Sequence, residues 1–383
     1  MPLNSSTATS RRVWILMFDH LQIDGADPIP LVESGDASPP PSLDHFNSFD
    51  DLDLRCSSFE QYVLQDSRVS ARLTDVLGGQ RAFERFAKHL DTLNKSSGLV
   101  RLSFDDSPLD YGESTTESAT RPEHRIEWPS TIERRLPRGA CDSSMQIDPE
   151  LRSTLSADVV WIEVIASGDA CREDSDRLLK LVQQWRLESQ PGSETTPVLI
   201  VSAIHGYARK VNPPFASGLA ESLIHVPLWI DHGASHACRI QTLAGSFDLL
   251  PTVGEFLLGS GNLSEPPETK PPNPSEQSGG LKGAPLSLAG VCSHSQPLPD
   301  RLLQLTGDSW TALRTQQYLL VHPVAGNSSR NEAGYSADDE MRATRCLYLK
   351  PDDVWNVNDA IVAYSSIADQ MELTAAQFQH RDP

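Results

Sequence analysis

Three apolar segments of strand length constrain the fold of this chain most. Residues 12–18, 158–166 and 197–202 are almost uninterrupted runs of Val, Ile, Leu and aromatic side chains. Such runs are typical of strands that are buried on both faces of a parallel sheet. Residues 175–187, between the second and third runs, have helical periodicity, which predicts a right-handed strand–helix–strand crossover. We therefore expect an α/β protein with a mixed, mostly parallel central sheet flanked by helices.

The rest of the chain divides by composition. We expect the α/β domain to span residues 11–259 and to end in a helix over 247–258, capped by Ser246. Residues 260–300 are rich in Pro, Ser and Gly, as expected of a linker or loop. Residues 301–383 contain a hairpin pattern, a further short strand and a closing helix over 359–378. This pattern predicts a small C-terminal unit of an antiparallel sheet plus a helix.

Composition excludes several classes of partner. The formal net charge of −20 argues against nucleic acid, because a phosphate backbone needs clustered Lys and Arg. No run approaches the roughly 20 apolar residues of a membrane span, and the first apolar run ends too soon for a secretory leader. The six cysteines are scattered without a CxxC pair, as expected of reduced thiols. These features predict a soluble cytoplasmic protein.

Several motifs then follow one another in a recognisable order. They are PVLIVS (197–202), His205-Gly206, ESLIHVPLWI (221–230), SFDLLPT (246–252), ALRT (312–315) and LYLKPDD (347–353). This succession resembles the sulfatase family of the alkaline-phosphatase-like superfamily. The resemblance implies an alkaline-phosphatase-like fold and the hydrolysis of sulfuric esters. It also implies a calcium ion on three carboxylates and a nucleophile in a C/S-x-P-x-R motif.

The metal positions implied by this resemblance have changed. The opening strand ends in Asp19-His20 where the family has two acidic residues, and the later turn reads Ile204-His205 where the family has an Asp. Calcium prefers six to eight oxygen ligands, so we expect no calcium site and no cofactor. An alternative stays open, because Asp19, His20 and His205 would suit Zn²⁺ or Fe²⁺ better than Ca²⁺ if they converged.

The nucleophile position has changed as well. The best frame for the motif is LQDSR (64–68), which places Leu64 in the nucleophile slot. Leucine can neither attack sulfur nor be oxidised to an aldehyde. Ser67 and Arg68 remain as remnants of the motif, although Ser67 could equally cap a helix. Lys210 could stand in for a sulfate-binding lysine, or be a solvated loop cation.

We interpret the chain as a sulfatase-like protein that is catalytically inactive. We expect it to have a binding, scaffolding or regulatory role toward a protein or small-molecule ligand. The alternative is an active sulfuric or phosphoric ester hydrolase with a rearranged metal site. Its residues would be His20, His205, Ser67 and Arg68.

Overall fold

The apolar runs form the centre of the larger sheet in the computed structural model. The structure describes residues 11–20, 52, 55–65, 73–104, 130–136, 147–165, 172–188, 196–206, 224–233, 238–258, 285–293, 298–307, 310–323, 345–350 and 358–379. The strands of this sheet are β1 (Val13–His20), β2 (Ser57–Phe59), β4 (Ser97–Phe104), β5 (Thr131–Leu136), β6 (Val159–Ile165), β7 (Val198–His205), β8 (Trp229–Asp231) and β9 (Cys238–Ile240).

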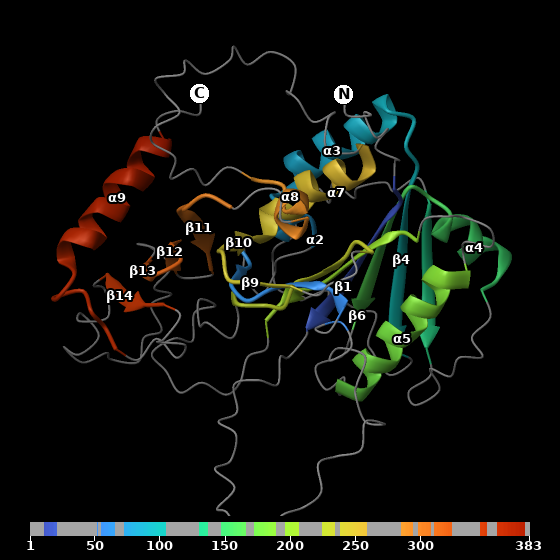
Figure 1. Ribbon diagram of the computed structural model, residues 1–383, viewed down its shortest axis with the longest axis horizontal. Helices are drawn as coiled ribbons and strands as arrows, with labels where there is room; N and C mark the ends of the chain where they lie inside the picture. Colours follow the sequence, from blue (N-terminus) through green and yellow to red (C-terminus); the bar gives the residue numbers. More distant parts are fainter. Residues whose placement is uncertain are drawn as a thin grey trace, which may run out of the picture. The chain divides into compact units, whose positions relative to one another are not determined.

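The order of these strands is β5-β4-β6-β1-β7-β8-β2-β9 (Figure 1). Strands β5, β4, β6 and β1 are parallel, and β8 is antiparallel to both β7 and β2. Every described side chain of β1 and all those of β6, including Glu163, are buried, as their almost uninterrupted apolar sequences predict. The mixed, mostly parallel sheet predicted from the sequence is therefore confirmed.

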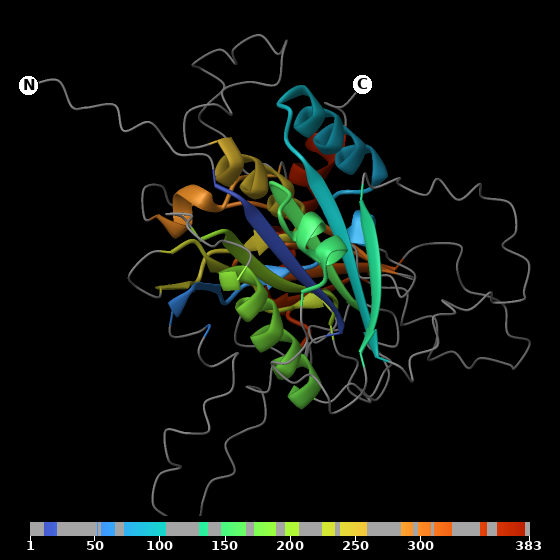
Figure 2. The same cartoon turned by 90° about the vertical axis from the view of Figure 1, so that its right-hand side faces the viewer.

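Helices cover this sheet. They are α3 (Gln80–Thr92), α4 (Pro149–Leu155) and α5 (Arg172–Glu188). Figure 2 shows α4 and α5 in front of the same face of the sheet. Helix α4 approaches β4 so closely that a Cβ on Gly98 would lie 2.6 Å from Cγ2 of Thr154, so this contact requires a glycine.

Two elements in residues 105–157 were not predicted. Helix α4 begins at a clear start signal, because the Asp148 side chain accepts a hydrogen bond from Leu151 N and Pro149 is the first helical residue. Strand β5 is an edge strand with the charged sequence TIERRL, which hides its periodicity. The Asp148-Pro149 signal could have been found in the sequence, whereas β5 is recognisable only from its pairing with β4.

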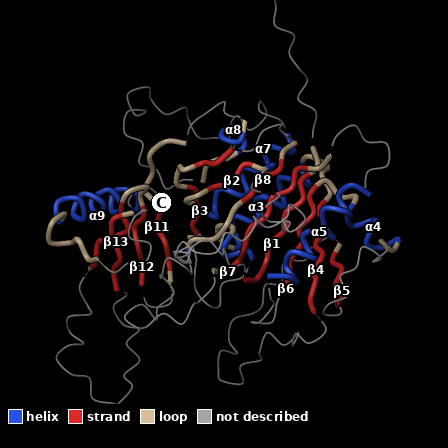
Figure 3. The backbone as a smooth tube through the Cα atoms, turned by 60° about the horizontal axis from the view of Figure 1, so that its bottom comes forward, coloured by secondary structure: helices blue, strands red, loops and turns tan. Residues whose placement is uncertain are grey.

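The smaller sheet has the strands β11 (Leu303–Thr306), β12 (Trp310–Arg314), β13 (Tyr318–Pro323) and β14 (Cys346–Leu349), all antiparallel in this order. Helix α9 (Ser365–Gln379) lies along it (Figure 3). The predicted antiparallel sheet plus helix is confirmed. The helix begins six residues later than predicted, because residues 361–364 form a turn.

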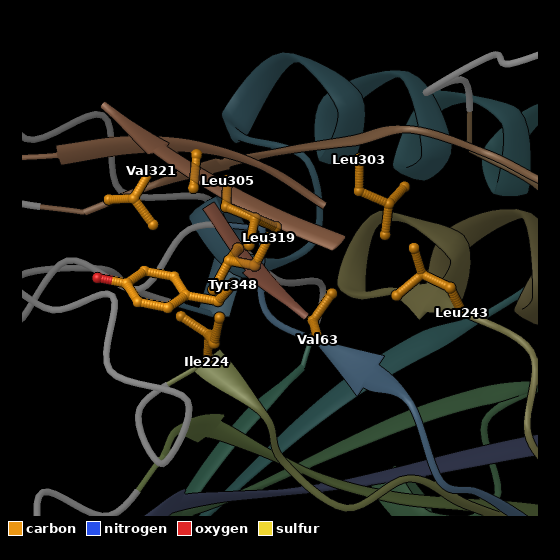
Figure 4. Close-up of a cluster of buried hydrophobic side chains, with 9 residues drawn as sticks. Val63, Ile224, Leu243, Leu303, Leu305, Leu319, Val321 and Tyr348 are labelled. Carbon is orange, nitrogen blue, oxygen red and sulfur yellow. The ribbon is translucent and has the colours of Figure 1, made fainter. Parts of the chain in front are cut away.

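Both faces of the smaller sheet are apolar and covered. One face packs in a cluster with Val63, Ile224 and Leu243 (Figure 4). The other packs against α9 through Ala368 and Met371. Side chains alternate between the two faces along each strand, so β12, β13 and β14 each contribute to both clusters.

The chain forms two compact units that interleave along the sequence. The first comprises residues 1–58, 84–203 and 227–239, and the second comprises residues 59–83, 204–226 and 240–383. The predicted boundaries at residues 259 and 301 stay a prediction. Within the described residues, no helix has the length and apolar character needed to cross a membrane. Cysteines 56, 238, 292 and 346 are free thiols.

An ion pair in the first unit gives stability a pH dependence. Arg186 Nη1 of α5 donates to Asp231 Oδ2 of β8 at 2.6 Å. Burial raises the pKa of the Asp231 carboxyl, but the charge and hydrogen bond of Arg186, with the hydrogen bond from Gly233 N and the charge of Arg55, lower it, so the pKa lies below its ordinary value. A lowered pKa stabilises the folded state above the unfolded pKa of about 4, and this stabilisation is lost as the pH falls through the folded pKa.

Asp231→Asn is therefore expected to lower the free energy of unfolding by about 1 kcal/mol near pH 7 and by less near pH 3. Urea unfolding of both proteins at the two pH values measures this difference. An equal loss at both values would contradict the assignment of this carboxylate.

Candidate functional site

Leu64, which the resemblance predicts to occupy the nucleophile slot, lies in the core of the second unit. Strand β3 (Tyr62–Val63) pairs in parallel with β10 (Ala244–Gly245) and leads directly into Leu64. The Leu64 side chain is completely buried, and its N–H donates to the Ile224 carbonyl at 2.7 Å. Helix α2 (Leu73–Val76) follows after residues that lie outside the described part. At this position the chain thus has a packed aliphatic side chain.

The next residue, Gln65, is held from three sides. Its backbone N–H donates to Ser246 Oγ at 3.1 Å, and its side-chain Oε1 accepts from Phe247 N at 3.2 Å. Its carbonyl accepts from Thr306 N at 2.9 Å. These bonds tie the backbone after Leu64 to β11 and to the start of the following helix. These three bonds therefore fix Gln65 between β11 and the start of that helix.

The bond between Phe247 N and the Gln65 side chain requires a glycine at position 245. A Cβ there would come into contact with Gln65 Oε1 and would lie 3.1 Å from Leu303 Cδ1. Any larger residue would displace the Gln65 amide from Phe247 N. This hydrogen bond therefore depends on the close approach of the β10 backbone to the Gln65 side chain.

The predicted cap of the helix at residues 247–258 was wrong. The segment begins with a 3₁₀ turn, η2 (Ser246–Asp248), and continues as α7 (Leu249–Leu258). Gly245 is the N-cap, and its N–H donates to Asp248 Oδ2 at 2.8 Å. The Ser246 hydroxyl instead accepts from Gln65 N, so a tertiary contact uses the group that sequence reasoning assigned to the cap.

Asp248 is also one half of a fully buried ion pair. Arg301 donates two hydrogen bonds to its carboxylate, at 2.7 and 3.0 Å, and the side chains of the pair are 0–1% exposed. Leu286 N donates to the same carboxylate at 2.8 Å. Sequence reasoning identified the SFDLLPT motif but not this pair, because the two residues are 53 positions apart.

The predicted metal positions lie at strand ends. Asp19 and His20 end β1, and His205 ends β7. These strands are neighbours in the sheet. Val198 N, at the start of β7, donates to Arg12 O, just before β1, which shows that the two strands run in the same direction. The side chains of Asp19 and His20 lie outside the described part, so convergence on a metal stays a prediction.

Among the described residues, no three His, Cys, Asp or Glu side chains are grouped so as to hold a metal ion. Ile204, which the resemblance predicts at a carboxylate position of the family, is 3% exposed and packs in the core. These residues do not fit a calcium site of the family type. Ser67, Arg68 and Lys210 lie outside the described residues, and their predicted roles stay predictions.

Comparison with known proteins finds likeness in structure alone. No protein-family model and no curated protein matches the chain. A Bacteroides thetaiotaomicron sulfatase from a locus for metabolism of multiple glycosaminoglycans matches with a TM-score of 0.56 and 10% identity, over 97% of this chain and 100% of that one.

Two further structures match with lower scores. An alkaline phosphatase superfamily protein from Vibrio parahaemolyticus has a TM-score of 0.48 and 12% identity, over 95% of this chain and 88% of that one. A phosphonate monoester hydrolase of Agrobacterium radiobacter has 0.43 and 10%, over 97% and 95%. At such identities the likeness to the sulfatase shows the fold and not the activity. The chain therefore shares its fold with a sulfatase, as the order of its motifs predicted.

Proposed function

We propose that this chain is a sulfatase-fold protein without ester hydrolase activity, which acts by binding a protein or a small molecule. The observation that carries the proposal is the completely buried Leu64 in the nucleophile slot. An aliphatic side chain has no lone pair with which to attack sulfur or phosphorus, so covalent catalysis has no starting atom there.

The surroundings of Leu64 support the same conclusion. Hydrogen bonds join Gln65 to Ser246, Phe247 and Thr306, so the backbone next to Leu64 is held in the packed interior. The carboxylate position predicted at the later turn is Ile204, which is buried in the core. Loss of one member of a catalytic unit typically costs orders of magnitude in rate, and here two positions have lost their chemistry. The four free thiols agree with a reducing compartment, and we propose the cytoplasm.

A second candidate is an ester hydrolase with a rearranged metal site. The parallel neighbours β1 and β7, which end at His20 and His205, favour it. Histidine nitrogens and one carboxylate suit Zn²⁺ or Fe²⁺. Ser67 and Arg68 would then have to supply the nucleophile and the anion contact.

Turnover assays separate these two functions. We expect aryl sulfate and aryl phosphate to be hydrolysed no faster with the purified full chain than in buffer alone, with or without added Ca²⁺, Zn²⁺ or Fe²⁺. Metal content is measured on the same sample by elemental analysis. Turnover above the buffer rate together with stoichiometric metal, both lost in His205→Ala, would replace the first proposal with the second. His225→Ala is the matched control for loss of an imidazole.

A further inference from the structure

A pocket of about 210 Å³ opens at one end of the smaller sheet, within the second compact unit. Three segments line it: residues 300–302 before β11, the β12–β13 turn at 315–318, and one face of α9 at 367, 370, 371 and 374. Pockets for drug-sized ligands measure roughly 300–1,000 Å³. This pocket therefore has room for a molecule of about one ring.

One part of the lining is apolar. Leu302 and Met371 are 4% and 5% exposed and belong to the cluster that joins α9 to the sheet. The Tyr318 ring also lines the pocket, and the Tyr364 ring packs beside it with centroids 6.2 Å apart and planes inclined by 52°. Tyr318 thus brings an aromatic side chain to the pocket, with a second ring packed beside it.

A second part of the lining consists of polar, uncharged side chains. Gln316, Gln317 and Gln370 contribute three carboxamides, and Gln317 and Gln370 are exposed. Each carboxamide donates and accepts hydrogen bonds. The nearby hydroxyls already have local bonds, since Thr374 donates to Gln370 O at 2.8 Å and Thr315 accepts from Tyr318 N at 3.0 Å. The amides are therefore the groups best placed to bond a ligand.

The charges around the pocket disfavour an anion. The guanidinium of Arg301 is committed to the buried carboxylate of Asp248 through two hydrogen bonds. Asp300, in contrast, lies exposed at the pocket. A chain with a net charge of −20 adds a repulsive background for sulfate or phosphate groups.

We infer that this pocket binds one uncharged, polyhydroxylated ring, such as a hexose or an N-acetylhexosamine. Hydroxyl groups both donate and accept, which matches carboxamides, and the C–H face of such a ring matches the Tyr318 and Met371 surface. The ligand bonds the amides of Gln317 and Gln370 and rests on the aromatic face. This binding site is independent of the nucleophile slot and needs no ester chemistry.

Saturation-transfer difference NMR on the full chain tests this inference. The probes are glucose and N-acetylglucosamine, with glucose 6-sulfate as the anionic comparison. We expect millimolar binding of a neutral sugar, weaker binding of the sulfate, and a roughly fivefold loss of affinity in Gln370→Leu, the effect of about one hydrogen bond. Gln317→Leu is expected to show a similar loss.

Gln377→Leu is the matched control, because this residue is exposed on the same helix and lies outside the pocket. It should bind as the parent chain does, and circular dichroism verifies that all variants are folded. The inference is overturned by absence of saturation transfer to both neutral sugars, by preference for the sulfate, or by unchanged affinity in both pocket variants. None of these outcomes bears on ester turnover, which is measured separately.

Discussion

Replacing Asp248 with alanine is expected to lower the free energy of unfolding by about 3–5 kcal/mol. The carboxylate is completely buried and accepts two hydrogen bonds from Arg301 and one each from Gly245 N and Leu286 N. Its removal leaves a buried guanidinium without its counter-ion and two backbone donors without an acceptor. An uncompensated buried charge costs more than the pair contributes, which explains the size of the effect.

Urea unfolding near pH 7 measures this loss, and a double variant identifies its cause. Asp248→Leu with Arg301→Met removes both charges and fills their volume, so it should be more stable than Asp248→Ala. It should stay below the parent chain, because Gly245 N and Leu286 N still lack their acceptor. If the double variant is less stable than Asp248→Ala, the buried charge is not the source of the loss.

Leu64→Asp is the second large effect that we expect. The site is completely buried, and burial raises the pKa of a carboxyl by up to about 3–5 units. At about 1.4 kcal/mol per unit, this amounts to roughly 4 kcal/mol of destabilisation near pH 7. A carboxylate in the nucleophile slot is therefore incompatible with the packing of this chain.

The destabilisation of Leu64→Asp depends on pH with a definite sign. A raised folded pKa means that the folded state binds the proton more tightly than the unfolded state. The variant is thus closest to the parent chain below the unfolded pKa of about 4, and it loses stability as the pH rises above it. Leu64→Met, which conserves volume, is the control and should cost less than about 1.5 kcal/mol at every pH.

A flat pH profile for Leu64→Asp would show that the side chain escapes to solvent. The nucleophile slot would then be able to open, and the case for an inactive protein would lose its main support. Unfolding midpoints between about pH 4 and pH 8 are sufficient to distinguish the two profiles.

The sequence by itself determined the elements whose buried apolar side chains recur at regular positions. The runs of β1, β6 and β7 are apolar at almost all consecutive positions, and α5 has an amphipathic period, so each element carries its own signal. The hairpin of β12 and β13 and the closing helix α9 were predicted for the same reason. The order of short motifs was sufficient to predict a fold shared with a sulfatase.

Only the tertiary structure decided how the candidate site is built. Whether Ser246 caps a helix or accepts from Gln65 depends on residues about 180 positions apart. The Asp248–Arg301 pair and the pocket beside Tyr318 likewise join segments that are distant in sequence. A local sequence pattern predicts how a residue interacts with its neighbours along the chain and with solvent. Contacts between distant segments are chosen by packing, and at such contacts a polar group takes the partner that burial places beside it.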